Sequence, residues 1–279
     1  MVLTIVEHEG FKWYVERKDD YLIFNDGEHT VRLVLAELSK YKRIFIDVGA
    51  HVGEYSIRMS RFYEKVIAIE PHPRHIEVFR KNIELNGIKN ITVIPKGCSD
   101  KREVVHLIDK GASSTVLDIY NQGEKIEVEL DRLDDMVKKA DVIKIDVEGY
   151  EEKVILGAMR IIKSQHPILV IEHHDVGERF SAHEEIRGMK ERISKLLHDY
   201  YQLNIDYAHY CYIHKSEDLT RYRFAVMCHW INKCLTNIEE GKNWYHGLPH
   251  TWWYGGNLLD FILALPKHIR KEKEWFEKI

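Results

Sequence analysis

The sequence predicts an α/β protein in which a mostly parallel, doubly wound sheet carries helices on both faces. Apolar runs typical of strands alternate with helical stripes through roughly 190 residues, the pattern of consecutive βαβ units with right-handed crossovers. The first long run ends in a polar turn bracketed by two glycines. The hydrophobic fraction of 44%, with only 16 Gly and 6 Pro, supplies a sizeable core and excludes a disordered or fibrous chain.

Residues 1–40 are expected to form a small β/α extension. The extension begins with three short apolar runs, which are separated by residues typical of turns: VLTIV, FKWYV and YLIF. Apolar residues then recur at the spacing of an amphipathic helix: Val31, Val34, Leu35 and Leu38. The main domain is expected to follow at residues 41–230, and a C-terminal extension at residues 231–279.

The first half of the main domain predicts three strands with helices between them. The strands are expected at residues 43–48, 65–70 and 91–95, and the helices at residues 54–63 and 73–87. Pro73 suits the first turn of the second helix, and Asn86-Gly87 suits its end.

The second half contains an insertion and then resumes the alternation. Runs of period two at residues 103–108 and 125–130 predict an antiparallel insertion. The remaining strands are expected at residues 141–146, 167–174, 201–206 and 222–228, with helices over 151–162 and 186–196.

The charge balance limits the classes of partner. There are 41 basic and 45 acidic side chains, a net charge of −4, which argues against a nucleic-acid surface. No segment reaches the roughly 18 apolar residues of a spanning helix, and the N-terminus is unlike a signal peptide, so a cytoplasmic protein is expected. The four cysteines form no C-x-x-C pair and predict buried reduced thiols rather than a zinc site. The sequence leaves open whether the protein forms a homo-oligomer.

A binding site is expected where the first two strands end. Gly49 and Gly53 lie in a turn where the missing Cβ allows a ligand to approach the backbone. Glu70 ends the second strand, where a carboxylate can accept both hydroxyls of a ribose.

Two cofactor classes fit this pattern: a nicotinamide dinucleotide, which would make the protein an oxidoreductase, and S-adenosylmethionine. The dinucleotide pattern G-x-G-x-x-G is absent, because the turn contains only Gly49 and Gly53. Asp47 would repel a pyrophosphate but attract the ammonium group of a methionine. S-adenosylmethionine is therefore favoured. A non-catalytic binding protein on the same scaffold is a further alternative.

Five motifs in order resemble those of the FkbM-type methyltransferases, over about residues 28–174. The motifs are DVGAHVGEYS at 47–56, IEPHPRHIEVFRKNIELNG at 69–87, VELDRLDD at 128–135, VIKIDVEGYEEKVILGA at 142–158 and HPILVIEHH at 166–174. The resemblance implies a class I, Rossmann-like fold with a seven-stranded sheet. It also implies S-adenosylmethionine-dependent methylation of a hydroxyl on a small molecule, saccharide or natural product.

The resemblance implies roles for particular residues. The methionine end is expected at Asp47, Gly49, Ala50, His51 and Gly53; the ribose at Glu70 and Pro71; the adenine near Ser99 or Asp100; and the sulfonium near Asp146. The family commonly has Asn at the position of His51.

The reacting end of the site is expected at Asp146, Glu148, His173 and His174. A histidine with a pKa near neutrality can take the proton of an acceptor hydroxyl, and His174 is favoured because it shares a strand face with Glu172. A divalent metal on Asp146, Glu148, Glu172 and His174 is an alternative that we do not favour.

The C-terminal extension is rich in aromatic residues. Five of the six Trp fall in the last 50 residues: Trp230, Trp244, Trp252, Trp253 and Trp275. We expect the extension either to pack on the core or to act as a lid whose rings stack on the acceptor.

Overall fold

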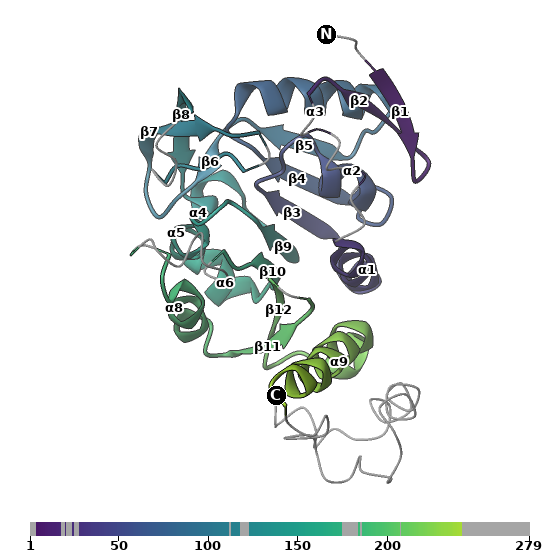
Figure 1. Ribbon diagram of the computed structural model, residues 1–279, viewed down its shortest axis with the longest axis vertical. Coiled ribbons are helices and arrows are strands. Elements are labelled where there is room, and N and C mark those ends of the chain that lie inside the picture. Colours follow the sequence, from purple (N-terminus) through teal and green to yellow (C-terminus); the bar gives the residue numbers. More distant parts are fainter. Residues whose placement is uncertain are drawn as a thin grey trace.

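Figure 1 shows the computed structural model of the chain, in which helices cover both faces of a twisted sheet. The structure describes residues 4–17, 20, 24, 28–111, 113–117, 123–174, 184, 186–206 and 208–241.

The central sheet has seven strands. Their order across the sheet is β11 (Tyr200–Asn204), β12 (His209–His214), β10 (Ile168–Glu172), β9 (Val142–Ile145), β3 (Ile44–Val48), β4 (Lys65–Ile69) and β5 (Ile91–Ile94). Strand β12 is antiparallel to both of its neighbours, and the other six strands share one direction. The predicted α/β sheet is thus found as a mixed sheet with one reversed strand.

The alternation of side chains along the strands assigns the helices to two faces. In β3, Phe45 packs on one face of the sheet and Ile46 on the other. The face of Phe45 is covered by α1 (His29–Leu38), α2 (Glu54–Met59), α3 (Pro73–Leu85) and α9 (Arg223–Glu239). The face of Ile46 is covered by α4 (Leu133–Met136), α5 (Glu151–Gly157), α6 (Met159–Gln165) and α8 (Met189–Leu196).

An N-terminal hairpin extends one of these layers. Its strands are β1 (Thr4–His8) and β2 (Phe11–Val15). Trp13 is fully buried, in one cluster with Ala50 and Phe79. The hairpin therefore packs against α3 and the turn after β3.

The predicted antiparallel insertion is confirmed. Strands β7 (Glu103–Asp109) and β8 (Glu124–Asp131) pair antiparallel, and the two-residue strand β6 (Gly97–Cys98) adds to β8 in parallel. Because β6 follows β5 directly, this small sheet lies beside the carboxyl end of the main one (Figure 1).

The expected strand at residues 222–228 is wrong, because residues 223–228 form the first part of a helix. Helix α9 begins at Arg223, and its buried residues Val226, Trp230 and Cys234 recur every fourth position. The local run of β-formers suggested a strand, but the longer period is helical. Strand β12 occupies the position in the sheet expected for residues 222–228.

Two further expectations differ in detail. The helix expected over 151–162 is interrupted at Ala158, which separates α5 from α6. The helix expected over 54–63 ends at Met59.

Much of the predicted C-terminal extension lies outside the described residues. Helix α9 continues to Glu239 with Trp230 buried in the core, whereas the other four tryptophans of the C-terminal cluster and the expected lid fall in 242–279. Within the described part of the chain, every helix is too short or too polar to cross a bilayer. The four cysteines are buried and form no disulfide.

Candidate active site

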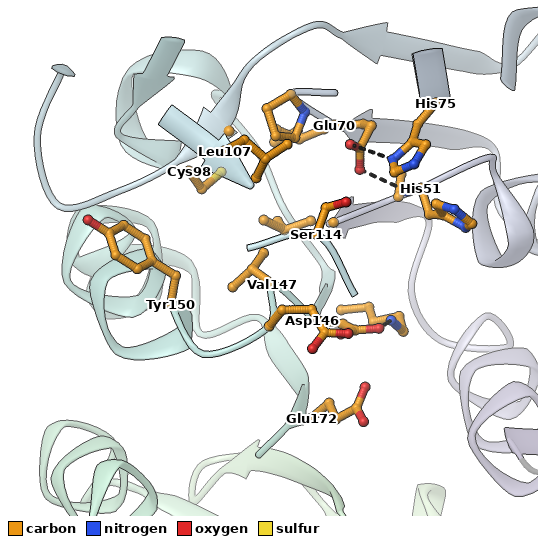
Figure 2. Close-up of a pocket in the computed structure, with 18 of the residues that line it drawn as sticks. His51, Glu70, His75, Cys98, Leu107, Ser114, Asp146, Val147, Tyr150 and Glu172 are labelled. Atoms are coloured by element: carbon orange, nitrogen blue, oxygen red, sulfur yellow. Dashed lines mark hydrogen bonds and ion pairs between the residues drawn. The ribbon is translucent and has the colours of Figure 1, made fainter. Parts of the chain in front are cut away.

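A pocket of about 250 Å³ opens at the carboxyl ends of β3, β4, β9 and β10. The chain order of the strands reverses between β3 and β9, which is where open α/β sheets bind ligands. Figure 2 shows Glu70, Cys98 and Leu107 at one end of the pocket, Asp146 and Val147 in the middle, and Glu172 at the other end.

The turn after β3 brings the backbone against the neighbouring strand. Gly49 has φ +85°, and a Cβ on it would lie 1.7 Å from the carbonyl oxygen of Asp146. Only glycine fits this position, because both the left-handed conformation and the contact exclude a side chain. His51 in the same turn has φ 49°, a conformation that His and Asn adopt more readily than most residues.

Glu70 is held by the same turn. One of its carboxylate oxygens accepts the N–H of His51 at 2.9 Å, and the other accepts the N–H of His72 at 2.9 Å and contacts Nδ1 of His75 at 3.3 Å. Burial would raise the pKa of Glu70, but the bond to His75 and the N–H of His72 lower it below its usual value. The carboxylate stays ionised, and the oxygen bonded to His51 has one lone pair left for a ligand.

His51 lies at the edge of the pocket with its ring against His75, at 4.3 Å between centroids. Its Nε2 is buried and has no hydrogen-bond partner in the described structure. Burial and the nearby His75 lower the pKa of His51 to about 3. The imidazole is therefore neutral, with one nitrogen available to a ligand.

The apolar end of the pocket is formed by β6 and the small sheet. Gly97, Cys98, Leu107 and Leu130 line it, together with the predicted Pro71. Ser99 and Asp100 do not line it: the Ser99 hydroxyl donates to Glu103 at 2.8 Å. The expected contact of Ser99 or Asp100 with an adenine stays a prediction, and the wall that the structure shows is one residue earlier.

Two other predicted residues lie behind the pocket wall. Asp47 is buried and accepts the hydroxyl of Ser56 at 2.6 Å. Gly53 has φ +94°, and a Cβ there would lie 2.2 Å from the ring of Phe79. Neither residue lines the pocket, so both support the turn from beneath.

The opposite end of the pocket is acidic. Asp146, Glu148, Glu172 and Glu28 line it, and Lys144 Nζ donates to Asp146 at 2.8 Å. Burial would raise the pKa of Asp146, but the Lys144 ammonium holds it well below the usual range. Burial and the charge of Asp146 raise the pKa of Glu172 to about 9. The acids crowd one another, and one buried lysine offsets only part of their charge.

His174 lies among four carboxylates and not on the pocket wall. Its Nδ1 is 2.8 Å from Glu151, and its Nε2 is 3.5 Å from Glu148, 3.8 Å from Glu172 and 3.9 Å from Asp146. Burial disfavours its charge, but Glu151 and the other acids raise its pKa well above the usual value. A protonated imidazole cannot accept a proton, so these surroundings do not favour His174 as the base.

His173 projects away from this cluster, as strand alternation predicts. It is fully buried, and its Nε2 lies 2.9 Å from the hydroxyl of Tyr212 on β12. Burial lowers its pKa to about 4. The contacts of His173 are those of a packed core residue.

Four residues at or beside the acidic end were missed from the sequence: Glu28, Glu54, Lys144 and His209. Lys144 had a signal, because a lysine inside a buried strand is almost always paired. No sequence pattern marked Glu28 or His209, because each is brought to the site by contacts with residues far away in the sequence.

The sheet order, the reversed strand and the pocket at the switch point define a doubly wound α/β fold with its pocket at the carboxyl edge of the sheet. The family model of the methyltransferase FkbM domain matches residues 47–196, 150 of the 279 residues. The chain belongs to the FkbM methyltransferase family.

Three individual proteins that resemble this chain share only 20–26% sequence identity with it. "Methyltransferase sdnD" of Sordaria araneosa is 26% identical, over 55% of this chain and 71% of its own length. "Methyltransferase 1" of Beauveria bassiana is 22% identical, over 40% of this chain and 57% of its own. The crystal structure of methyltransferase FkbM from Methylobacillus flagellatus is 20% identical with a TM-score of 0.45, over 62% of this chain and 44% of its own.

Proposed function

We propose that the protein uses S-adenosylmethionine to methylate a hydroxyl oxygen of a small molecule, saccharide or natural product. The observation that carries this proposal is one continuous pocket that joins the ionised Glu70 to the acidic end at Asp146 and Glu172. When bound, S-adenosylmethionine supplies a methyl group on a positively charged sulfur.

The end at Glu70 suits an adenosine. Leu107, Leu130 and Cys98 give apolar walls for a flat ring. Glu70 offers an oxygen to a ribose hydroxyl, and His51 adds a buried nitrogen without a hydrogen-bond partner. Because two backbone N–H groups already hold Glu70, we propose that it binds one hydroxyl and not both.

The acidic end suits a cation. Among the described residues that line the pocket, Lys144 is the only Lys or Arg, against six carboxylic acids: Glu28, Glu54, Glu70, Asp146, Glu148 and Glu172. A sulfonium and an ammonium gain from the acids that are ionised, such as Asp146 and Glu70, whereas the pyrophosphate of a dinucleotide would be repelled. The same feature therefore favours S-adenosylmethionine over a nicotinamide cofactor.

The main contribution of the chain to methyl transfer is to position the methyl donor and the acceptor. Gly49 lets the turn after β3 come within contact of the Asp146 backbone in the pocket wall. Holding donor and acceptor in line can supply about 7 kcal/mol or more of the barrier reduction. Lys144 fixes the Asp146 carboxylate beside the expected position of the sulfonium.

Calorimetry with S-adenosylmethionine and S-adenosylhomocysteine tests the cofactor. We expect both to bind the full chain, and Glu70→Ala to weaken both by at least 100-fold. Glu77→Gln on the exposed face of α3, where Glu77 pairs with Lys81, is the matched control and should bind normally.

Binding of neither compound at millimolar concentration would overturn the proposal. Protection against thermal unfolding by NAD(H), without protection by S-adenosylmethionine, would favour an oxidoreductase instead. Binding without turnover of any hydroxylated acceptor would favour a non-catalytic protein.

A further inference from the structure

His209, the first residue of β12, reaches the acidic end of the pocket from the reversed strand. It is 4% exposed, and its Nδ1 lies 2.9 Å from Oδ1 of Asp206. The same Asp206 oxygen accepts the backbone N–H groups of Ala208 and His209 at 3.1 and 2.9 Å. One carboxylate oxygen of Asp206 therefore fixes both the His209 ring and the backbone beside it.

The tautomer of His209 follows from this contact. A carboxylate only accepts hydrogen bonds, so the proton of the neutral ring lies on Nδ1. The lone pair of Nε2 then faces the other way, and this buried atom has no hydrogen-bond partner in the described structure. An Asp–His pair that presents a bare Nε2 is the outer shell that metal-binding histidines commonly have.

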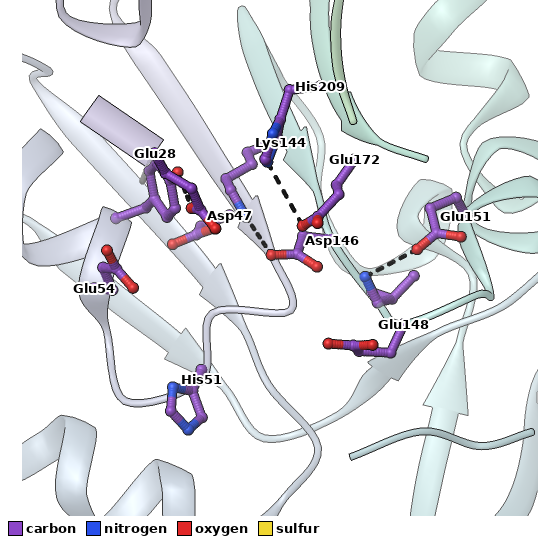
Figure 3. A network of polar contacts seen from close by, with 12 residues as sticks. Glu28, Asp47, His51, Glu54, Lys144, Asp146, Glu148, Glu151, Glu172 and His209 are labelled. Carbon is purple, nitrogen blue, oxygen red and sulfur yellow. Dashed lines mark hydrogen bonds and ion pairs between the residues drawn. The ribbon is translucent and has the colours of Figure 1, made fainter. Parts of the chain in front are cut away.

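Nε2 of His209 faces two carboxylates. It lies 3.5 Å from Oε2 of Glu172, outside hydrogen-bond geometry, and an oxygen of Glu28 completes a group of three atoms that all lie within 4.8 Å of one another. Figure 3 shows His209 above Glu172, and Glu28 to the left of both, beyond Lys144 in this view. Each of these three atoms can offer a lone pair to a cation placed between them.

We propose that Glu28, Glu172 and His209 bind a divalent cation at the acidic end of the pocket. Ligand atoms about 2.1 Å from an octahedral ion lie about 3.0 Å apart when adjacent and about 4.2 Å when opposite. The separations here need only small side-chain shifts to reach those values. Two carboxylates with one imidazole suit Mn²⁺ or Mg²⁺ better than a soft ion.

This group is distinct from Asp146, Glu148 and His174, which also come within 4.8 Å of one another. His174 is already surrounded by acids on both ring nitrogens, so its environment is explained without an ion. Of the histidines in these two groups, His209 alone has a buried ring nitrogen with no hydrogen-bond partner in the described structure. Glu172 lies between the two groups, with Oε1 toward His174 and Oε2 toward His209.

The role of the ion rests on the proposed function. Glu28 and Glu172 line the pocket, so the ion would coordinate the acceptor hydroxyl and lower its pKa. The hydroxyl gives its proton to water. Its oxygen forms the new C–O bond to the methyl carbon as the C–S bond breaks and leaves its electron pair on sulfur.

Titration of the metal-free 279-residue chain with Mn²⁺, followed by electron paramagnetic resonance, tests the site without reference to activity. We expect one tightly bound Mn²⁺. His209→Phe, which puts an aromatic ring without nitrogen atoms in place of the imidazole, should weaken binding by at least 100-fold. Asp206→Asn should weaken it by 10- to 100-fold, because Asp206 only orients the ring. His214→Phe, at the other end of β12, is the matched control and should bind normally.

Absence of Mn²⁺ binding at millimolar concentration in the unchanged protein would overturn the proposal. Unchanged binding by His209→Phe, with loss in His174→Phe, would do so as well, because it would assign the ion to the other group. If His209→Phe fails to fold, Glu28→Gln decides in its place. Calorimetry with S-adenosylhomocysteine is read separately, so failure of the metal site and failure of the proposed cofactor give different results.

Discussion

The imidazole of His174 and the carboxylate of Glu151 form a buried contact of 2.8 Å between the end of β10 and the first residue of α5. Glu151 is fully buried, and it also accepts the N–H groups of Val147 and Gly149. One side-chain pair thus fixes the loop that carries Asp146 and Glu148 into the pocket.

His174→Ala should therefore cost stability. Removal of one partner of a buried charged pair leaves the other uncompensated, at about 3–5 kcal/mol. Urea unfolding measures this loss, and His198→Ala, at an exposed histidine, should change it by less than about 0.5 kcal/mol. In a double-mutant cycle with Glu151→Gln, we expect a coupling energy of about 1–3 kcal/mol. Additive effects would show that the contact does not stabilise the fold.

Gly49→Ala should abolish cofactor binding. The new Cβ would meet the Asp146 carbonyl at 1.7 Å, so β3 and β9 must separate at the pocket. Gly87→Ala is the matched control, because Gly87 also has positive φ, +61°, but a Cβ added there would have no atom within 4 Å. We expect Gly87→Ala to cost about 1 kcal/mol through its backbone conformation alone and to bind S-adenosylhomocysteine normally. Normal binding by Gly49→Ala would contradict the close approach.

His51→Asn should preserve both stability and cofactor binding. Asn tolerates the left-handed conformation at φ 49°, and the backbone N–H that holds Glu70 remains. His51→Val should lower the free energy of unfolding by about 1–3 kcal/mol, because a β-branched residue is strained there. Thermal unfolding and calorimetry distinguish the two variants. Equal loss in both would mean that the ring, and not the backbone conformation, matters.

Acid should destabilise the protein through His229. Burial and Lys233 lower its pKa to about 4, and its Nδ1 accepts the N–H of Asn204 at 3.2 Å. The folded pKa lies below the unfolded value of 6.5, so its contribution is full above about pH 6.5 and is lost as pH falls toward 4. At pH 5 the loss is about 2 kcal/mol. Urea unfolding at pH 7 and pH 5 should show a smaller difference for His229→Gln, and an equal one would reject this source.

The sequence predicted the fold well because most of its signals were local. The strand-to-helix turns at Gly49 and Pro73 and the alternation in β7 and β8 appear where expected. The error at residues 222–228 arose because a helix that packs on a sheet can begin with β-forming residues. The reversal of β12 is a tertiary feature with no local sign.

The site was predicted in part. Glu70, His51 and Asp146 do line one pocket, because the ends of adjacent parallel strands meet at one edge. Ser99 lies just outside it, since one residue along a strand turns a side chain to the opposite face. Charge states could not be read from the sequence, because they depend on neighbours such as Glu151 that only folding brings to His174.

The uneven charge along the pocket gives the protein an electric field with a direction. A ligand with a cationic end would be turned and drawn toward the Asp146 carboxylate before it makes contact, as a low-dielectric cleft focuses the field of its charges. Salt screens such steering over about 8 Å at physiological ionic strength. The rate of association, more than the rate of release, should then fall as salt is added.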